Sequence, residues 1–203
     1  SGHSSYVTGV AFNADGSILA SGSEDDTVRL WKVPGGALLG VLQGHSANVT
    51  GLAFSPDGVQ LASAGSDRVI RVWNVASRRQ VGTLSGHTEN ANSVAFSPDG
   101  SLIVSAGSGI DDNTLRLWDA EALTQVQVLY PDGPTNAIAF SPDGTLLASG
   151  GATFLTLWGV PRDSTAGPTR WDDLLTHSRN GGILGLCLLR RITPISCEGL
   201  TCA

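Results

Sequence analysis

The chain has 203 residues; 15% are charged, 26 are glycine and the formal net charge is −6. Low charge and abundant glycine favour a turn-rich β protein over a helical or disordered one. The negative charge argues against a nucleic-acid partner, which is bound by excess lysine and arginine, and the pair Arg78–Arg79 is too small a basic patch to change this. The apolar runs fall short of the ~20 residues that cross a bilayer, so we expect no membrane partner.

All three cysteines (Cys187, Cys197 and Cys202) lie close to the C-terminus. The remainder of the chain therefore cannot depend on disulfides. Their spacing matches no familiar zinc pattern, so we expect no metal site and no cofactor. The sequence begins at Ser1 and contains no methionine, from which we expect a processed or truncated product.

Three markers repeat along the chain in one register. Ser-Pro-Asp-Gly begins at Ser55, Ser97 and Ser141, and a variant begins at Asn13. A phenylalanine precedes each copy, and a tryptophan follows it: Phe12, Phe54, Phe96 and Phe140, then Trp31, Trp73, Trp118 and Trp158. Gly-His pairs at 2–3, 44–45 and 86–87 have the same period, which is 42 residues. The chain is therefore a repeat protein.

The second repeat shows how one unit folds. Residues 49–54, 61–63, 69–73 and 80–84 are short β-rich runs, separated by turns in which proline presets φ and glycine accepts a positive φ. Short strands at regular spacing indicate a sandwich, a barrel or a propeller. A period of about 42 residues selects the propeller.

The repeats resemble the WD40 family. The resemblance rests on Gly-His, on the aromatic residue ahead of Ser-Pro-Asp-Gly, on Leu-Ala-Ser-Gly-Ser and its relatives, and on Asp-x-Thr-(Val/Leu)-Arg-Leu-Trp. It covers about residues 2–159, and within this range the Trp-Asp pair itself is present only at Trp118–Asp119. It implies an all-β chain of about four WD40-type propeller blades, incomplete or open, with an irregular C-terminal tail. We place the blades at about 2–43, 44–85, 86–129 and 130–159, and a linker and tail at 160–203.

The resemblance also implies a hydrogen-bonded set of four side chains in each blade. Carried over to this sequence, the sets are His3–Ser21–Asp25–Trp31, His45–Ser63–Asp67–Trp73 and His87–Ser105–Asp112–Trp118. Indole N–H only donates, carboxylate only accepts, and hydroxyl and imidazole do both, so the four can satisfy one another when buried. We name each set a tetrad and expect it to hold the strands of its blade in register.

A catalytic interpretation of these residues competes with the structural one. Serine, histidine and aspartate also form nucleophilic triads, but a triad needs an exposed serine and an oxyanion hole. Three copies, each joined to a tryptophan, favour a structural brace. The histidines belong to different blades, which argues against a shared metal. The strands expected to be innermost carry no acid or histidine, so a propeller enzyme is disfavoured as well.

The fourth repeat departs from the pattern. Pro131 replaces the histidine and Ala152 the aspartate, so we expect this blade to be held by apolar packing alone and to be the weakest. We also expect it to lack its fourth strand, because a Pro- and Gly-containing linker follows Trp158. In the tail, residues 169–178 fit a short helix or an aberrant strand. The apolar run at 182–189 fits a strand on an open edge or a membrane-seeking patch.

Four repeats fall short of the usual propeller ring. WD40 rings of about seven blades need roughly 290–300 residues, and an open arc would expose apolar faces at both ends. We expect a fragment of a longer propeller. Partial propellers that complete one another by self-association, or a four-bladed ring, are the alternatives.

The expected function is a protein-interaction scaffold that binds other proteins or peptides. A regulatory module fused to an NTPase or kinase domain is the alternative, and its test would be a motif outside this sequence. The candidate contact residues lie three and five positions after each repeat histidine, or directly before the turn aspartate. They are Tyr6, Thr8, Asn48, Thr50, Asn90, Asn92, Glu24, Ser66 and Asp111.

Overall fold

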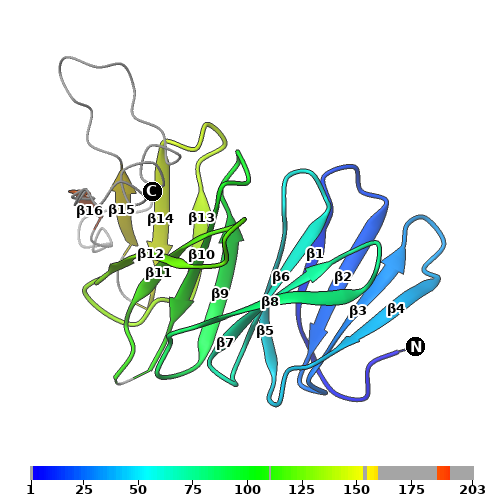
Figure 1. The fold of residues 1–203 in the computed structure, drawn as a ribbon. Helices are drawn as coiled ribbons and strands as arrows, with labels where there is room; N and C mark the ends of the chain where they lie inside the picture. Colours follow the sequence, from blue (N-terminus) through cyan, green and yellow to red (C-terminus); the bar gives the residue numbers. More distant parts are fainter. Residues whose placement is uncertain (1, 110, 153–154, 160–186, 193–203) are drawn as a thin grey trace, which may run out of the picture.

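The computed structural model describes residues 2–109, 111–152, 155–159 and 187–192, and in them it contains strands and no helix. Within this part of the chain there is accordingly no helix that could span a membrane. The strands form four sheets of four strands each. The all-β class and the four blades predicted from the sequence are confirmed (Figure 1).

The sheets, which we call blades 1 to 4, follow one another along the chain. Blade 1 contains β1 (Val7–Phe12), β2 (Ile18–Ser23), β3 (Thr27–Lys32) and β4 (Leu38–Gln43). Blade 2 contains β5 (Val49–Phe54), β6 (Gln60–Gly65), β7 (Val69–Asn74) and β8 (Arg79–Ser85). Blade 3 contains β9 (Ala91–Phe96), β10 (Leu102–Gly107), β11 (Leu115–Asp119) and β12 (Gln125–Leu129). Blade 4 contains β13 (Ala137–Phe140), β14 (Leu146–Gly150), β15 (Leu155–Gly159) and β16 (Cys187–Ile192).

Each blade is an antiparallel meander whose register the sequence repeat preserves. In blade 2, Phe54 lies opposite Leu61, and Leu61 lies opposite Trp73. The turn between the first two strands is built by Ser-Pro-Asp-Gly. Asp57 accepts the Ser55 hydroxyl at 2.5 Å and the Val59 N–H at 3.0 Å, and Gly58 has φ 71°. This Asx-type closure explains why the tetrapeptide recurs in blades 2 to 4.

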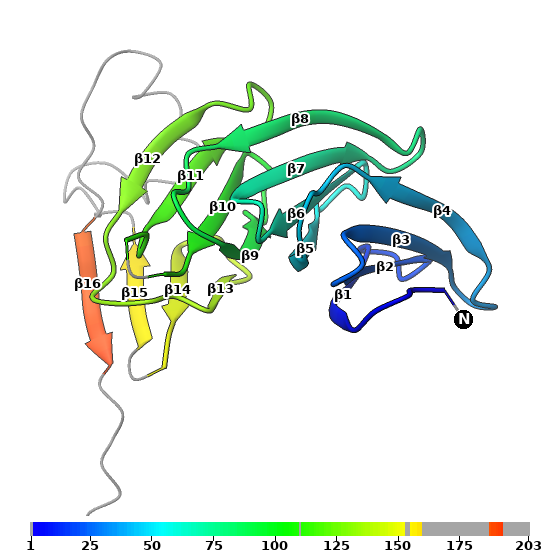
Figure 2. The same ribbon diagram turned by 90° about the horizontal axis from the view of Figure 1, so that it is seen from below.

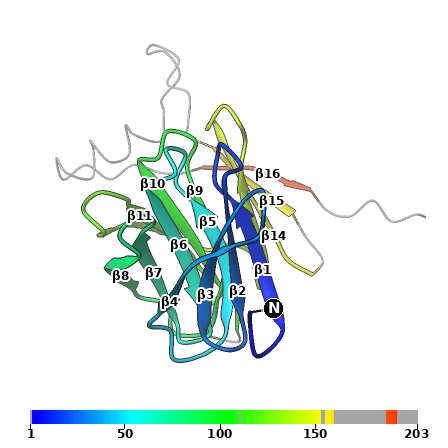
Figure 3. The ribbon, with the colours of Figure 1, turned by 90° about the vertical axis from the view of Figure 1, so that its right-hand side faces the viewer.

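The blades stand side by side in an arc. The first strands of successive blades contact one another, so β1, β5, β9 and β13 form the inner wall (Figures 1 and 2). In Figure 3 blade 1 lies in front of the others. Blades 1 and 4 lie at opposite ends of the arc, so the alternative of a closed four-bladed ring is wrong for this structure.

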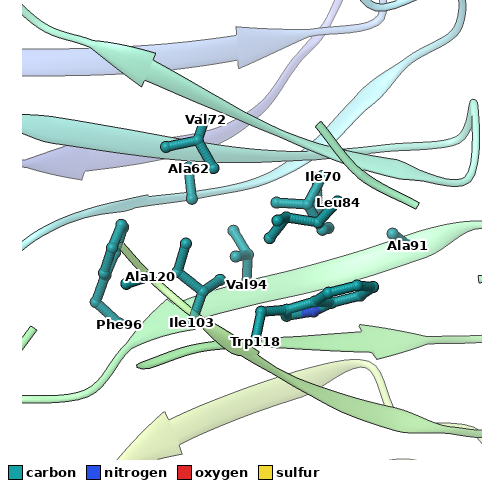
Figure 4. Close-up of a cluster of buried hydrophobic side chains, with 11 residues drawn as sticks. Ala62, Ile70, Val72, Leu84, Ala91, Val94, Phe96, Ile103, Trp118 and Ala120 are labelled. Atoms are coloured by element: carbon teal, nitrogen blue, oxygen red, sulfur yellow. The ribbon is translucent and has the colours of Figure 1, made fainter. Parts of the chain in front are cut away.

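Apolar cores lie between the blades rather than within them. The core between blades 2 and 3 joins Ile70 and Leu84 of one blade to Val94, Ile103 and Trp118 of the next (Figure 4). Equivalent clusters lie between blades 1 and 2 and between blades 3 and 4. Both faces of a sheet carry apolar side chains, as stacking on two neighbours requires.

In the part of the chain that the structure describes, blade 1 has a neighbouring blade on one side only, and the exposure of its inner strand shows the consequence. Phe12 is 60% exposed and Val10 63% exposed, whereas their equivalents in blade 3, Phe96 and Val94, are 9% and 6% exposed. The same repeat positions are therefore buried or solvated according to whether another blade covers them. The open end face predicted for an incomplete arc is present in the structure.

The fourth strand of blade 4 corrects the prediction that this blade ends after Trp158. Residues 187–192 pair antiparallel with β15, with Leu155 opposite Ile192 and Gly159 opposite Cys187. Part of the apolar run at 182–189 thus supplies a strand to a blade edge, one of the two interpretations the sequence left open. The segment predicted at 169–178, and Cys197 and Cys202, lie outside the described residues.

Candidate functional site

The four polar side chains expected to form a tetrad in blade 2 lie together. His45 Nδ1 is 2.9 Å from Asp67 Oδ1, and His45 Nε2 is 2.7 Å from Ser63 Oγ. Trp73 Nε1–H donates to the same Ser63 oxygen at 2.8 Å. The tetrad therefore links the loop before β5 to β6, to the turn after it and to β7.

One protonation state satisfies every polar atom in this chain of contacts. A neutral imidazole with its proton on Nδ1 donates to the carboxylate and accepts the serine O–H at Nε2, while the serine oxygen accepts the indole N–H. Burial lowers the pKa of His45, outweighing the opposing effect of Asp67. Burial lowers the pKa of His87 in the same way, against Asp112. Both imidazoles are thus held neutral.

These lowered pKa values predict a loss of stability in acid. The unfolded chain takes up protons on its histidines as the pH falls through about 6.5, while folded His45 and His87 resist protonation. Proton uptake then favours the unfolded state, so the free energy of unfolding falls as the pH drops below that value. We expect imidazole proton resonances of both residues to titrate with midpoints below 6.5 in NMR spectra. A midpoint at or above 6.5 for either residue would contradict the neutral network.

Blades 1 and 3 repeat this geometry. In blade 1 the histidine–aspartate, histidine–serine and tryptophan–serine distances are 2.9, 2.7 and 2.8 Å, for His3, Asp25, Ser21 and Trp31. In blade 3 they are 2.9, 2.7 and 2.9 Å, for His87, Asp112, Ser105 and Trp118. Nearly identical distances in three blades indicate one repeated unit of architecture.

The threonine of Asp-x-Thr fixes the carboxylate in two of the three tetrads. In blade 3, Asp112 Oδ1 accepts the Thr114 hydroxyl at 2.6 Å, which leaves Oδ2 for His87. Burial raises the pKa of Asp112, but the hydrogen bonds from Thr114, Thr88 and His87 outweigh it and hold the pKa below its usual value. Blade 2 has Val69 at the threonine position.

In blade 1 the pKa of the aspartate is likewise set by burial and hydrogen bonds acting in opposite directions. Burial raises the pKa of Asp25, yet hydrogen bonds from Thr27, from the Ser4 N–H and from His3 hold it far below its usual range. In blade 2, Asp67 uses Oδ1 for His45, and its Oδ2 lies 3.5 Å from the Arg71 guanidinium. The replacement of threonine by valine in Asp-x-Thr of blade 2 therefore changes which groups bind the carboxylate.

A reciprocal pair of substitutions tests the role of this hydroxyl. Thr114→Val should lower the free energy of unfolding by about 0.5–1.5 kcal/mol, because it removes a hydrogen bond to a buried carboxylate. Val69→Thr should raise it by up to about 1 kcal/mol, since it supplies the missing donor to Asp67. Urea denaturation measures both. The interpretation is wrong if Thr114→Val is neutral, or if Val69→Thr destabilises as much as Thr114→Val does.

The glycine of each Gly-His pair packs beside the tryptophan of its tetrad. A Cβ on Gly44 would lie 3.1 Å from Trp73 Cη2, and one on Gly2 would lie 2.4 Å from Trp31 Cη2. The absence of a side chain therefore lets the loop approach the indole closely. The sequence marked these glycines by their recurrence, without showing what they contact.

Blade 4 retains half of the polar arrangement, which corrects the prediction that apolar packing alone holds it. Trp158 Nε1–H donates to Ser149 Oγ at 2.9 Å, and Ser149 is buried. Pro131 and Ala152 replace the histidine and aspartate, as the sequence indicated. Blade 4 therefore keeps the tryptophan–serine hydrogen bond of the tetrad without the histidine and the aspartate.

Burial of the serines favours a structural role over a nucleophilic one. Ser63 and Ser105 are 0% exposed, and each is enclosed by its histidine and tryptophan. A nucleophile must reach a substrate carbonyl, which a sealed hydroxyl cannot do. The described residues also contain no group of three histidine, cysteine or acidic side chains that could hold a metal.

The candidate contact residues mostly lie at one end of the blades. The strands alternate in direction, so the loops that enter each blade and the turns between its second and third strands share an end, which we call the loop face. Backbone hydrogen bonds join these segments: Glu24 N–H to Tyr6 O, and Ser66 N–H to Asn48 O. Tyr6 is 79% exposed. The exposed candidates on this face are Tyr6, Glu24, Asn48, Asn90 and Asp111.

The two threonines among the candidates use their hydroxyls within the fold, although Thr8 itself is exposed. The Thr50 hydroxyl donates to Ala91 O of the next blade at 2.5 Å, and the Thr8 hydroxyl contacts Val49 O in the same manner. These threonines clamp neighbouring inner strands together. Ser66 and Asn92 are half-buried.

Sequence spacing missed a further loop-face residue, Ser108. Its N–H donates to Asn90 O at 3.0 Å, which is the contact that Ser66 makes with Asn48 in blade 2. The turn of blade 3 is longer than those of blades 1 and 2, so counting back from Asp112 reaches Asp111 instead. Matching the residues just after β6 and β10 would have found Ser108.

A family model described as WD domain, G-beta repeat, matches residues 1–32, 36–74, 78–119 and 124–158, which is most of the chain. The chain belongs to the WD40 repeat family. Proteins of this family are typically protein-interaction scaffolds built on propeller blades. No curated protein matches the WD40 chain.

Among solved structures, a chain in a crystal structure of a mitotic checkpoint complex is similar, with a TM-score of 0.78 and 25% sequence identity. The alignment covers 97% of this WD40 chain and 56% of that chain. The present sequence thus spans little more than half the length of its structural neighbour. The likeness supports the propeller-blade architecture.

Proposed function

We propose that this chain is a protein-interaction scaffold whose loop face binds a protein or peptide partner. The observation that carries the proposal is that each tetrad also fixes the loop next to it. Asp67 accepts the Ser46 N–H at 3.1 Å, and Asp112 accepts the Thr88 N–H at 2.7 Å. Asp25 accepts the Ser4 N–H at 2.9 Å. Each carboxylate thus ties the residue that follows the repeat histidine.

Fixed loops favour binding because less conformational entropy is lost when a partner docks. Tyr6, Asn48 and Asn90 each lie two residues beyond a tied N–H group, so their backbone positions are set by the tetrads. The backbone bond from Ser66 to Asn48 adds a second fixed point in blade 2. The tetrads therefore contribute to function indirectly, by holding the contact residues in place.

The chemistry of the loop face fits a polar peptide or protein surface. Tyr6 offers a largely exposed ring and hydroxyl, a residue type enriched at binding hot spots. Asn48 and Asn90 offer amide donors and acceptors, and Glu24 and Asp111 offer carboxylates. A partner segment with backbone hydrogen-bonding groups and a basic side chain would be complementary to these groups.

The test compares two matched triple variants in affinity capture from a lysate of the source cells, with quantitative mass spectrometry. The loop-face variant is Tyr6→Ala/Asn48→Ala/Asn90→Ala. The control changes three exposed residues at the other end of the blades, Lys32, Arg79 and Glu121, to alanine. We expect at least one partner to be held by wild type and control and lost from the loop-face variant.

Thermal denaturation of all three proteins accompanies the capture, since a binding loss counts only where folding is unchanged. Partners that are lost equally from both variants, or retained by the loop-face variant, would argue against the loop face as the binding surface.

A further inference from the structure

The opposite end of the blades carries an apolar cavity that the proposed function does not use. This end, which we call the turn face, contains the turns between first and second strands and those between third and fourth strands. The cavity has a volume of about 320 Å³ and lies between blades 1 and 2. Its apolar wall is made by Ile18, Leu30, Leu39, Val59 and Val75, and Arg78 lies at it as well.

The cavity between blades 2 and 3 at the same end has a similar volume, about 310 Å³, but its lining includes three carboxylates and is more polar. The residues at one position of the turn between third and fourth strands differ as well. In the turn of blade 3, Leu123 occupies the position that Arg78 has in blade 2, and both residues have positive φ, 54° and 59°. A Cβ on Gly82 would lie 2.2 Å from Leu123 Cδ1, and a Cβ on the equivalent Gly40 would lie 2.6 Å from Arg78 Cδ. Leucine and arginine therefore lie over the same spot on successive blades.

The consequence for packing differs between the two sites. Leu123 packs on the core between blades 2 and 3 as a partly buried apolar side chain. Arg78 lays its stem on Gly40 and is exposed, and of the wall residues Ile18 and Leu39 are half-buried while Leu30 and Val75 are buried. Val59 in this wall is 50% exposed. The lining of the cavity is thus mainly aliphatic, and an aliphatic side chain of a ligand would be complementary to it.

The positively charged side chains near the cavity indicate that a ligand bound there would carry an acidic group. Within the described part of the chain, the Arg78 guanidinium makes no hydrogen bond or ion pair, and exposed Arg79 follows it. Lys32 lies opposite Ile18 in the β2–β3 register, so its side chain is on the same side of the sheet as the cavity wall. Asp57 accepts hydrogen bonds from Ser55 and Val59 instead. A carboxylate beside the aliphatic group would be complementary to Arg78.

We propose that this cavity binds a peptide segment of a protein partner that presents a leucine-like side chain next to a carboxylate. The aliphatic group enters the apolar cavity beside the Arg78 stem, where it contacts Ile18, Leu39 and Val59, and the carboxylate pairs with the Arg78 guanidinium. The site lies at the end of the blades opposite the loop face. The proposal can therefore be tested independently of the proposed function.

The probe is the peptide Gly-Ser-Leu-Asp-Gly-Ser, acetylated and amidated so that aspartate carries its only charge. It is titrated into the full chain and followed by amide chemical shifts in NMR spectra. We expect saturable shifts at Val59, Val75 and Ala76, and none at their blade 3 counterparts Ser101, Ala120 and Glu121. Analogues with alanine for leucine, or asparagine for aspartate, should bind about tenfold more weakly.

Substitutions that copy the residues of blade 3 separate this site from general surface charge. Arg78→Leu should weaken peptide binding about tenfold or more, because it removes the cation that pairs with the aspartate of the peptide. Leu123 shows that leucine is accommodated at this φ. Val59→Ser, which copies Ser101, should also weaken binding and serves if Arg78→Leu does not fold. Arg79→Leu is the charge-matched control and should bind within about twofold of wild type.

Absence of saturable shifts at Val59 and Val75 would overturn the proposal. Equal weakening by Arg78→Leu and Arg79→Leu would do the same, since it would mean nonspecific attraction to positive charge. If the protein binds the asparagine analogue as tightly as the aspartate peptide, the carboxylate takes no part in recognition and that part of the proposal is wrong. Peptide binding should be unaffected by the loop-face triple variant, so the outcome here does not depend on the function proposed above.

Discussion

Phe96→Ala should lower the free energy of unfolding by about 3–5 kcal/mol, as is usual for loss of a buried aromatic side chain. Phe12→Ala, at the same position of the repeat, should cost less than about 1 kcal/mol, as exposed substitutions generally do. Phe96 is 9% exposed in the core between blades 2 and 3, whereas Phe12 is 60% exposed on the open face of blade 1. Urea denaturation of the two variants measures both values.

This pair is informative because residue type, strand and register are the same, and only the covering blade differs. Similar losses for the two variants would mean that Phe12 is buried in solution. Self-association through the open face would produce that result, and a sedimentation experiment at the same protein concentration would identify it. Phe96→Ala with a loss under about 1 kcal/mol would contradict inter-blade stacking as the main source of stability.

Asp67→Ala should lower the free energy of unfolding by about 1–3 kcal/mol, because the His45 Nδ1–H is left buried without its acceptor. The same change also removes the acceptor of the Ser46 N–H and the ion-pair partner of Arg71, whose guanidinium keeps its hydrogen bond to Gln80. Glu121→Ala removes an equal charge from an exposed turn and should change stability by no more than about 0.5 kcal/mol. Chemical denaturation of both variants at pH 7 provides the comparison.

Since Asp67 also fixes the loop after His45, the proposed function adds an expectation for this variant. Hydrogen exchange of the Ser46 amide should quicken in Asp67→Ala beyond the change that global stability explains. An unchanged denaturation midpoint would remove Asp67 from the structural role assigned to it.

The regular part of the fold could be predicted because its signals are local and repeat. The period of the tryptophans and Ser-Pro-Asp-Gly turns gives the strands of the first three blades, since turn chemistry and apolar alternation act over a few residues. β16 could not be predicted in the same way. It is separated from β15 by a long segment without the repeat motifs, and pairing over such a separation leaves no local pattern.

The candidate functional site was also predictable from the sequence only in part. The tetrads could be predicted because the resemblance to WD40 repeats implies them and the first three blades carry the same four residue types at matching positions. The role of Thr50 did not follow, since its hydroxyl acts on Ala91 of the next blade and the sequence shows no contact between blades. The cavity beside Arg78 could not be predicted from the sequence, because only the structure shows that Arg78 and Leu123 occupy equivalent positions on successive blades.

A double-mutant cycle on His45 and Ser63 tests the central claim most directly, which is that the tetrad works as one connected brace. The free energies of unfolding of His45→Ala, Ser63→Ala and the double variant are measured at pH 7. Because both residues share the hydrogen bond at 2.7 Å, the two losses should couple by about 0.5–3 kcal/mol. Losses that add to within about 0.3 kcal/mol would show that the two side chains act independently, and the brace would have to be abandoned.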